Sequence, residues 1–349
     1  MKKAMGIFLV LCLAVTFVLA GCNSQKQAVA GAGGEPAGKI VIYTSMYEDI
    51  IEAVDRVLER TFPRCDIEFL YGGTGALQAR INAEQASGRL GCDMLLVAEP
   101  SYSLELKETG MLHTYKSPAA SNLLFDYDPD GYWYPVRISN MVIAYNPEKS
   151  SRNSVPGSFY DFAYDAGLKG LVSMSNPLTS GTAMATVTAL KDKYGYTYFE
   201  ALAKQEVVIE SGSVALERLE SGECRAVMIL EESVLKKREE ERSKLEVIYP
   251  DDGTVMIPST IMTIAEKWSA SQNAAAAEKI TDWFLGTEGQ NAIVSGWMHS
   301  VRKDYPKPPF DSIPTAQIMA LSMPVNWINC FKQRNEIQER FEELVIIGR

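Results

Sequence analysis

The sequence predicts an α/β fold built from two doubly wound lobes, and two observations carry this prediction. Short runs of β-branched and aromatic residues alternate with helical patterns along the chain, which is typical of mainly parallel sheets covered by helices. About 310 residues follow the N-terminal segments, and a single core usually stops growing near ~250–300 residues. We therefore expect two lobes rather than one.

The first part of the chain gives three predicted strands, over 39–43, 66–71 and 93–97. Each precedes a helical pattern, and the first helix has an apolar stripe through Ile51, Val54 and Leu58. A segment rich in Asp, Pro, Gly and aromatic residues, 127–135, interrupts this alternation. A further strand is expected over 136–145.

The alternation resumes in the second part of the chain. Strands are predicted over 170–174, 206–209, 226–230 and 260–264, the last of them after a proline-marked segment, 250–258. Helices are predicted over 274–285 and 333–345. No internal repeat is evident.

The N-terminus indicates export. Lys2 and Lys3 precede an apolar run, 7–20, that is shorter than the ~20 residues of a spanning helix. The run ends in Leu-Ala-Gly-Cys22, which resembles the bacterial lipobox and implies lipidation of Cys22; an ordinary secretory signal is the alternative. We expect a lipoprotein signal peptide over 1–21, a Gly- and Ala-rich flexible tether over 22–38, and attachment to an outward-facing membrane surface through lipid at Cys22.

Composition excludes several classes of protein. The formal net charge is −10, and no Lys/Arg cluster lies beside aromatic residues, so nucleic-acid binding is not expected. In an exported protein, Cys65, Cys92, Cys224 and Cys330 suggest one or two disulfides, although the sequence does not choose the pairing. Their spacing does not suit zinc, and we expect neither a metal site nor a cofactor.

Catalysis is not expected either. The chain has two histidines, His113 and His299, and contains no Gly-x-Ser-x-Gly elbow, HExxH or Walker motif. The sequence does not exclude a Ser-His-Asp arrangement that uses one of these histidines, but nothing else supports it.

Three segments have the composition of an anion cradle, because each follows a predicted strand and opens a predicted helix. At such a place, backbone N–H groups lack helical partners and the helix dipole favours negative charge. The alternative is an ordinary helix N-cap. The residues concerned are Gly73, Thr74 and Gly75; Ser180, Gly181 and Thr182; and Ser211, Gly212 and Ser213, with Ser45 as a weaker fourth position.

Four motifs in a fixed order resemble the bacterial extracellular solute-binding proteins of the ferric-iron and phosphonate type. They are Tyr-Gly-Gly-Thr-Gly75, Met-Val-Ile-Ala-Tyr-Asn146, Asn-Pro-Leu-Thr-Ser-Gly-Thr182 and Asp-Trp-Phe-Leu-Gly-Thr-Glu-Gly289. The similarity spans about 39–304 and implies the type II periplasmic-binding fold, with two lobes joined by two crossovers and a ligand cleft between them. The crossovers would fall near 135–137 and 257–260.

The resemblance also implies boundaries and partners. Lobe one would comprise 39–136 plus 259–303, and lobe two 137–258 plus 304–349. The expected protein is a monomer that works with the permease and ATPase of an ABC importer and closes around a small anionic solute.

The expected ligand depends on where this sequence departs from the family. Iron-binding members usually carry adjacent tyrosines where this chain has Glu231 and Glu232, and many carry a histidine near Ser45. We therefore expect a phosphorylated or phosphonate-bearing organic solute, of the aminoalkyl phosphonate or thiamine phosphate type, with ferric ion as the alternative and sugars third. Glu231 or Glu232 could meet a ligand cation or simply begin a helix, and Arg137 could bind an oxyanion or form a structural ion pair.

Aromatic residues offer a further possibility. Tyr132, Trp133 and Tyr134 could stack on a ligand ring, but packing at the lobe junction is the more common use of such residues. Tyr47, after the first predicted strand, is a similar candidate for the cleft.

Overall fold

The computed structural model describes residues 35–305, 307–308 and 312–348. The predicted signal peptide, Cys22 and most of the predicted tether lie outside this part of the chain. Apart from 306, 309–311 and 349, the described residues cover both predicted lobes.

One mixed sheet runs through both predicted lobes, in the order β2-β1-β3-β9-β4-β7-β5-β6, with β8 paired to β4. The outer strands pair in parallel, β2-β1-β3 on one side and β7-β5-β6 on the other, as the strand–helix alternation predicted. The strands are β1 Gly38–Thr44, β2 Cys65–Tyr71, β3 Met94–Ala98, β4 Trp133–Tyr145, β5 Val172–Ser175, β6 Val208–Glu210, β7 Ala226–Leu230, β8 Glu246–Ile248 and β9 Val255–Thr263.

Helices follow the strands and cover the sheet. They are α1 Glu48–Thr61, α2 Thr74–Ala86, α3 Ser101–Glu108, α4 Phe159–Tyr164, α5 Gly181–Tyr194, α6 Thr197–Lys204, α7 Gly212–Ser221, α8 Glu231–Glu241, α9 Ala274–Leu285, α10 Thr287–Ser295, α11 Thr315–Leu321 and α12 Trp327–Phe341. The predicted helix 274–285 coincides with α9, whereas α12 begins six residues before the predicted 333.

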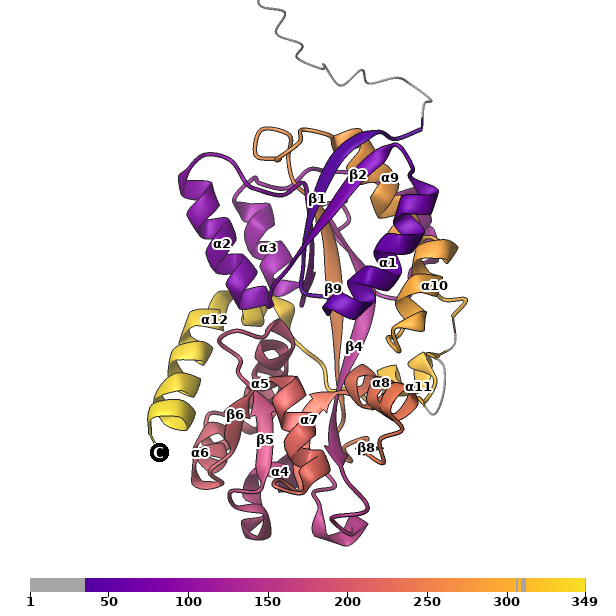
Figure 1. Ribbon diagram of the computed structural model, residues 1–349. Coiled ribbons are helices and arrows are strands. Elements are labelled where there is room, and N and C mark those ends of the chain that lie inside the picture. The colour runs from indigo at the N-terminus through magenta and orange to yellow at the C-terminus, as the bar shows by residue number, and fades with distance from the viewer. Residues whose placement is uncertain (1–34, 306, 309–311, 349) are drawn as a thin grey trace, which may run out of the picture. The chain divides into compact units, whose positions relative to one another are not determined.

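The long strands β4 and β9 connect the two predicted lobes and lie side by side in Figure 1. They pair antiparallel from Trp133↔Met262 to Met141↔Val255, with an irregularity between Pro135 and Arg137. This irregularity lies at the crossovers implied by the family resemblance. The prediction that 250–258 precedes the strand was wrong, because β9 already begins at Val255 and includes Pro258.

Each predicted lobe has its own buried clusters. In lobe one, Ile42 and Phe284 belong to one cluster, which also takes in Ile138, Met256 and Ile318 of predicted lobe two, and Tyr102 belongs to another. In lobe two, Phe199 belongs to the largest cluster and Val227 to a further one. Separate cores are the expected solution for a chain of this length.

The expectation of disulfides was wrong, because all four cysteines in the described part of the chain are free. Each belongs to a different cluster: Cys330, Cys92 and Cys224 lie within three of them, and Cys65 packs against the fourth. Thiols that pack in separate cores do not approach one another, whereas a disulfide requires Cα atoms about 4.4–6.8 Å apart.

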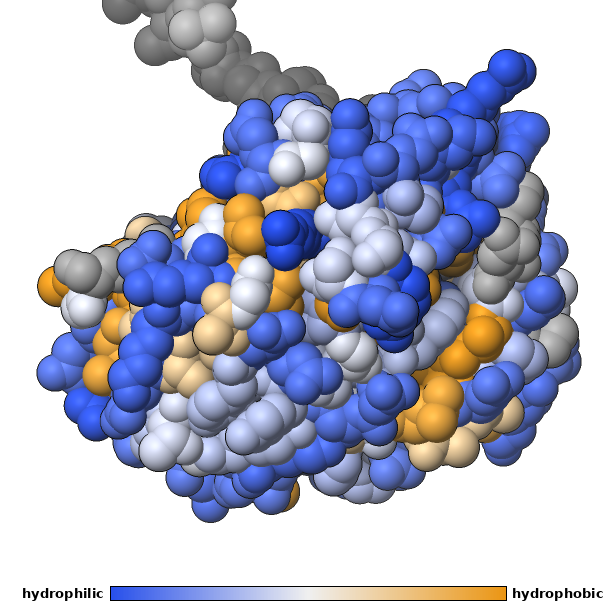
Figure 2. Space-filling model, turned by 90° about the horizontal axis from the view of Figure 1, so that it is seen from below, coloured by the Kyte–Doolittle hydropathy of each residue, from blue (hydrophilic) through white to orange (hydrophobic). Residues whose placement is uncertain are grey.

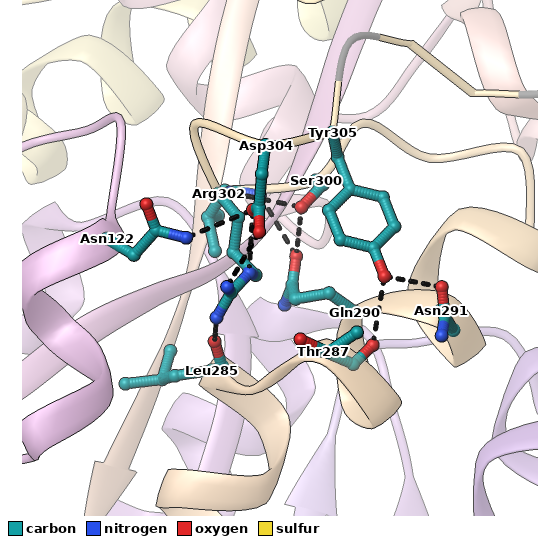
Figure 3. A network of polar contacts seen from close by, with 10 residues as sticks. Asn122, Leu285, Thr287, Gln290, Asn291, Ser300, Arg302, Asp304 and Tyr305 are labelled. Atoms are coloured by element: carbon teal, nitrogen blue, oxygen red, sulfur yellow. Dashed lines mark hydrogen bonds and ion pairs between the residues drawn. The ribbon is translucent and has the colours of Figure 1, made fainter.

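The chain leaves lobe one through a segment held by buried polar contacts (Figure 3). Gln290 donates to the carbonyls of Val136 and Phe284, at 2.8 and 2.7 Å. It accepts from Val301 N and from Ser300 Oγ, and Figure 3 shows the contact with Ser300. Nearby, the guanidinium of Arg302 donates to both carboxylate oxygens of Asp304, at 2.9 and 2.8 Å. Asn122 donates to the same carboxylate.

Beyond this segment Ile318 of α11 still packs in the lobe-one cluster, and the chain joins the main lobe-two cluster from Met323, which adds a third passage to the two implied crossovers. Met323 N donates to Thr254 O at 2.7 Å, and α12 then packs Ile337 and Phe341 into the main lobe-two cluster. α12 packs against both α3 and α5.

The surface seen from below in Figure 2 is mostly hydrophilic, and its apolar side chains lie in separate patches. Single apolar residues scattered over a surface are ordinary in proteins. None of the helices in the described residues is long and apolar enough to cross a membrane.

Candidate functional site

The N-terminus of α2, from lobe one, meets the N-terminus of α5, from lobe two. Gly75 N donates to Thr179 O at 3.2 Å. A Cβ placed on Gly181 would lie 2.7 Å from Thr74 Oγ1 and 3.1 Å from Ala98 O. The carboxyl ends of β2 and β3 therefore touch the loop after β5, in the region where open α/β sheets bind ligands.

Glycine is required for this close approach. A Cβ on Gly75 would lie 2.6 Å from Leu178 O, and one on Gly73 would lie 2.9 Å from Thr179 O. Both obstructing atoms are backbone oxygens, which do not rotate away as the end of a side chain can. A side chain at either position would therefore push the two predicted lobes apart.

A small cavity of about 10 Å³ lies at this contact. Such a volume accommodates about one water-sized atom. Thr74 is 2% exposed, and its Oγ1 has no hydrogen-bond partner among the described residues. The lining residues come from α2, α5 and α12, from the segment before α5 and from the turn between β3 and α3, and they are Thr74, Gly75, Gln78, Glu99, Pro177, Leu178, Thr179, Ser180, Gly181, Met184, Arg334 and Gln338.

The third predicted cradle segment lies opposite Tyr47. Ser211 is the N-cap of α7, and a Cβ on Gly212 would lie 3.9 Å from the hydroxyl of Tyr47. Tyr47 is 38% exposed. The surroundings of its hydroxyl keep water away and so raise its pKa, and the negative charges of Glu232 and Tyr71 raise the pKa further. Tyr47 thus reaches from the end of β1 toward the N-termini of α7 and α8.

The hydroxyls of the predicted cradle already make local contacts. Ser180 Oγ accepts from Ala183 N at 3.2 Å and lies 3.0 Å from Thr182 Oγ1. Ser211 Oγ accepts from Val214 N at 3.4 Å and lies 3.2 Å from Ser213 Oγ. The N-cap interpretation therefore describes these serines in this structure, and ligand binding by them stays a prediction.

Arg137 and Glu232 are buried charges near the β4–β9 irregularity, each 4% exposed. Burial lowers the pKa of Arg137 and raises that of Glu232, and each charge partly offsets the shift of the other. Glu232 Oε1 has no hydrogen-bond partner within the described residues, and neither does Oγ of Ser259, which pairs with Arg137 across the strands. Unpartnered buried polar atoms of this kind suit a site that receives a polar ligand.

Glu231 faces different surroundings, although it is adjacent to Glu232. It is 1% exposed and accepts from Asn140 Nδ2 at 3.0 Å and from the hydroxyl of Tyr249 at 2.5 Å. His299 Nε2 lies 3.2 Å from the same carboxylate. Glu231 thus links β4, α8 and the segment that leaves lobe one.

Comparison with known proteins identifies the family of this chain. Residues 92–318 match the model of the bacterial extracellular solute-binding protein family, which is more than half of the chain. The chain belongs to this family. A curated relative, the probable ABC transporter periplasmic-binding protein y4fP of Sinorhizobium fredii, is 21% identical over 229 residues. That alignment covers 63% of this chain and 62% of the relative.

Solved structures establish the fold of this solute-binding protein. AfuA from Actinobacillus pleuropneumoniae, with fructose-6-phosphate bound, has a TM-score of 0.76 at 20% identity, covering 89% of this chain and 99% of that one. Iron-bound HitA from Pseudomonas aeruginosa has a TM-score of 0.75 at 19% identity, covering 88% and 99%. A periplasmic thiamin-binding protein has a TM-score of 0.72 at 17% identity, covering 90% and 98%. The type II periplasmic-binding fold is thereby confirmed, and the family is one of solute-binding proteins rather than enzymes.

The other predicted residues of the solute-binding protein lie around the same edge of the sheet or just behind it. Ser45 Oγ accepts from Ala98 N at 3.0 Å, so it ties the end of β1 to the end of β3. Tyr134 is buried and donates to Tyr115 O, while Trp133 packs against a lobe-one cluster. The aromatic run therefore packs within lobe one.

Sequence reasoning missed Ser259, Glu99 and Arg334. Ser259 and Glu99 belong to no sequence motif, and Ser259 reaches the site only through strand pairing. Arg334 carried a usable signal, because it interrupts an apolar stripe formed by Cys330, Ile337 and Phe341 on α12. A charged residue in such a stripe requires a buried partner.

Proposed function

We propose that this protein is the substrate-binding component of an ABC importer, which captures a small anionic organic solute when its two lobes close. The observation that carries the proposal is the meeting of two helix N-termini, α2 and α5, around Thr74 Oγ1, which has no partner among the described residues. Both N-termini present partial positive charge, which favours an oxyanion. A permease and an ATPase are the proposed partners.

The proposed solute is a phosphorylated or phosphonate-bearing organic molecule of the aminoalkyl phosphonate or thiamine phosphate type. Its oxyanion would lie against the cradle residues, and Arg137 would supply a buried positive charge. Glu232 Oε1, which lacks a partner among the described residues, would accept from a cationic end of the solute. One protein of similar fold holds fructose-6-phosphate and another is a thiamin-binding protein, which supports an organic solute.

Ferric ion is the second candidate, because two phenols and a carboxylate lie near one another. Tyr47, Tyr71 and Glu232 offer the hard oxygen ligands that Fe³⁺ prefers, and an iron-bound relative shares the fold. Against this, the buried guanidinium of Arg137 lies close enough to affect Glu232 and Tyr47, and it would repel a trivalent cation. We therefore favour the anionic solute.

Serine-to-aspartate variants test the cradle. Ser180→Asp should abolish binding of phosphate and 2-aminoethylphosphonate, since it sets like charge against the ligand, while Ser180→Ala should cost about 1 kcal/mol of binding free energy. Ser213→Asp should act like Ser180→Asp. Because Asp caps a helix as well as Ser does, Ser180→Asp should unfold at the same urea concentration as the native protein. Calorimetric titration and urea unfolding measure both effects.

Asn326→Asp is the matched control, because Asn326 is the exposed N-cap of α12 and gains the same charge away from the α2–α5 contact. It should bind phosphonate as the native protein does. Native binding by Ser180→Asp and Ser213→Asp would contradict the cradle. Stoichiometric iron in freshly purified protein, with a charge-transfer colour, would favour the second candidate.

We also propose that lipid at Cys22 holds the protein on an outward-facing membrane surface. This rests on the lipobox-like segment, which lies outside the described residues. Mass spectrometry of the native protein should find a diacylglycerol-modified Cys22 as the first residue. An intact signal peptide, or a mature N-terminus at another residue, would contradict it.

A further inference from the structure

The C-terminal helix α12 carries an arginine in its buried stripe. Cys330, Ile337 and Phe341 pack in the main core of lobe two, and Arg334 lies between them on the same stripe, only 7% exposed. A buried guanidinium is costly unless it is paired and hydrogen-bonded. The hydrogen-bond partners of Arg334 therefore indicate the role of this buried charge.

The partners of Arg334 come from the other lobe. Its Nη2 donates to Glu99 Oε1 at 2.7 Å and to Ser101 Oγ. Glu99 follows β3 of lobe one, is 1% exposed, and adopts φ +70°, a left-handed conformation uncommon outside glycine. Its other oxygen accepts from Ser101 N at 2.7 Å, which fixes the carboxylate toward α12.

We propose that Arg334 and Glu99 form an ion pair between the lobes that couples α12 to closure, with Arg334 and Glu99 as positioning residues for the solute site. The inference rests on the proposed closure of the two lobes. In the closed arrangement both charges are buried, so each depends on the other. When the lobes part, each charge regains water and the dependence ends.

The pair lies beside the proposed oxyanion cradle. Glu99 and Arg334 line the same cavity as Thr74 and Gly181, and Arg334 Nε has no partner among the described residues. Whatever separates the pair therefore also separates the N-termini of α2 and α5. The stability of this contact should set the closed fraction, and the apparent affinity for any solute scales with that fraction.

Charge removal distinguishes this coupling from a merely structural role. Arg334→Gln leaves Glu99 buried and unpaired in the closed state, and Glu99→Gln does the same to Arg334. Each single variant should therefore open the lobes, which small-angle X-ray scattering measures as a larger radius of gyration without ligand. The double variant Arg334→Gln/Glu99→Gln removes both charges, so its radius should return toward the native value.

Binding of inorganic phosphate provides a second readout. Each single variant should weaken phosphate binding by about tenfold if the closed fraction falls by that factor, and the double variant should recover most of the loss. Arg340→Gln, on the exposed face of α12 and paired with Glu343, is the matched control and should change neither quantity. Arg334→Lys keeps the charge and should open the lobes less than Arg334→Gln.

The outcomes separate this inference from the proposed function. Equal radii for all variants, or a double variant more open than either single one, would overturn the ion-pair coupling. Radii that follow the expected pattern in a protein that binds neither phosphate nor 2-aminoethylphosphonate would uphold the coupling and contradict the anionic solute. Circular dichroism shows that each variant is folded before its radius is compared.

Discussion

Glu231 and Glu232 show how two identical neighbours acquire different roles. Glu231 accepts from Asn140 and Tyr249 through its two oxygens, so an amide in its place would keep one acceptor oxygen for these two donors. We expect Glu231→Gln to lower the free energy of unfolding by roughly 2–3 kcal/mol. Glu232→Gln, the matched change beside it, should lower it far less. Urea unfolding measures both, and equal losses would contradict the distinction.

Glu232 should also make stability depend on pH. Burial raises its pKa above 4.5 in the folded protein, so the folded state holds the proton more tightly than the unfolded chain. This contribution is fully present below pH 4.5 and is lost as the pH rises through the raised pKa. Relative to the native protein, Glu232→Gln should therefore gain stability as the pH rises from 4.5 toward neutrality. A constant difference across a series of urea unfolding curves would argue against a raised pKa.

The candidate site was only partly accessible to sequence reasoning at this scale. Glycines and hydroxyl residues between a strand and a helix have a local signature, and Gly75, Ser180 and Ser211 were found through it. Ser259 and Glu99 have no such signature, because they reach the site through strand pairing and a left-handed backbone conformation. Which of the two glutamates faces Arg137 depends on the turn into α8, which no periodicity encodes.

Among the connecting elements, the segment that leaves lobe one depends most on a single side chain. Gln290 is fully buried and makes four hydrogen bonds to four other residues. Gln290→Ala should lower the free energy of unfolding by about 3–4 kcal/mol, since each orphaned buried group costs ~1–3 kcal/mol. Asn291→Ala, on the same helix but exposed, is the control in urea unfolding. A loss below about 1 kcal/mol would mean that water replaces the amide.

Helices and strands whose apolar residues recur with a regular period were predicted well. Those in which a proline or a charged residue interrupts the apolar pattern were predicted with wrong boundaries. The strand 226–230 and the helix 274–285 coincide with β7 and α9. β9 was predicted too short, because Pro258 reads as a strand breaker although its carbonyl still accepts from Glu99 N. The predicted start of α12 was late, since the stripe that contains Cys330 and Arg334 mixes a thiol and a charge with apolar residues.

At the scale of the whole molecule, the continuous sheet should make the two lobes unfold together. β4 and β9 contribute strands to both halves, so neither half keeps its sheet if the other unfolds. We expect one transition in calorimetry, with equal calorimetric and van't Hoff enthalpies. The control measures fluorescence unfolding in two variants. One keeps Trp133 in lobe one as its single tryptophan, and the other keeps Trp327 on α12. Two separated transitions would show that the strands do not couple the lobes.

Each of the four thiols lies in or against a different buried cluster, so the reactivity of each cysteine reports on its own part of the protein. Burial raises the pKa of every one of them, to about 12 for Cys224 and about 11 for Cys330. Cys92, Cys224 and Cys330 are buried, so their alkylation has to wait until the surrounding side chains move apart, whereas Cys65 is half-buried. The rate at which iodoacetamide modifies each of the three buried cysteines, followed by peptide mass spectrometry, therefore reports the local opening free energy of the core that holds it. A bound solute that protects Cys330 and Cys92 more than Cys224 would reveal which parts of the protein become stiffer when it is captured.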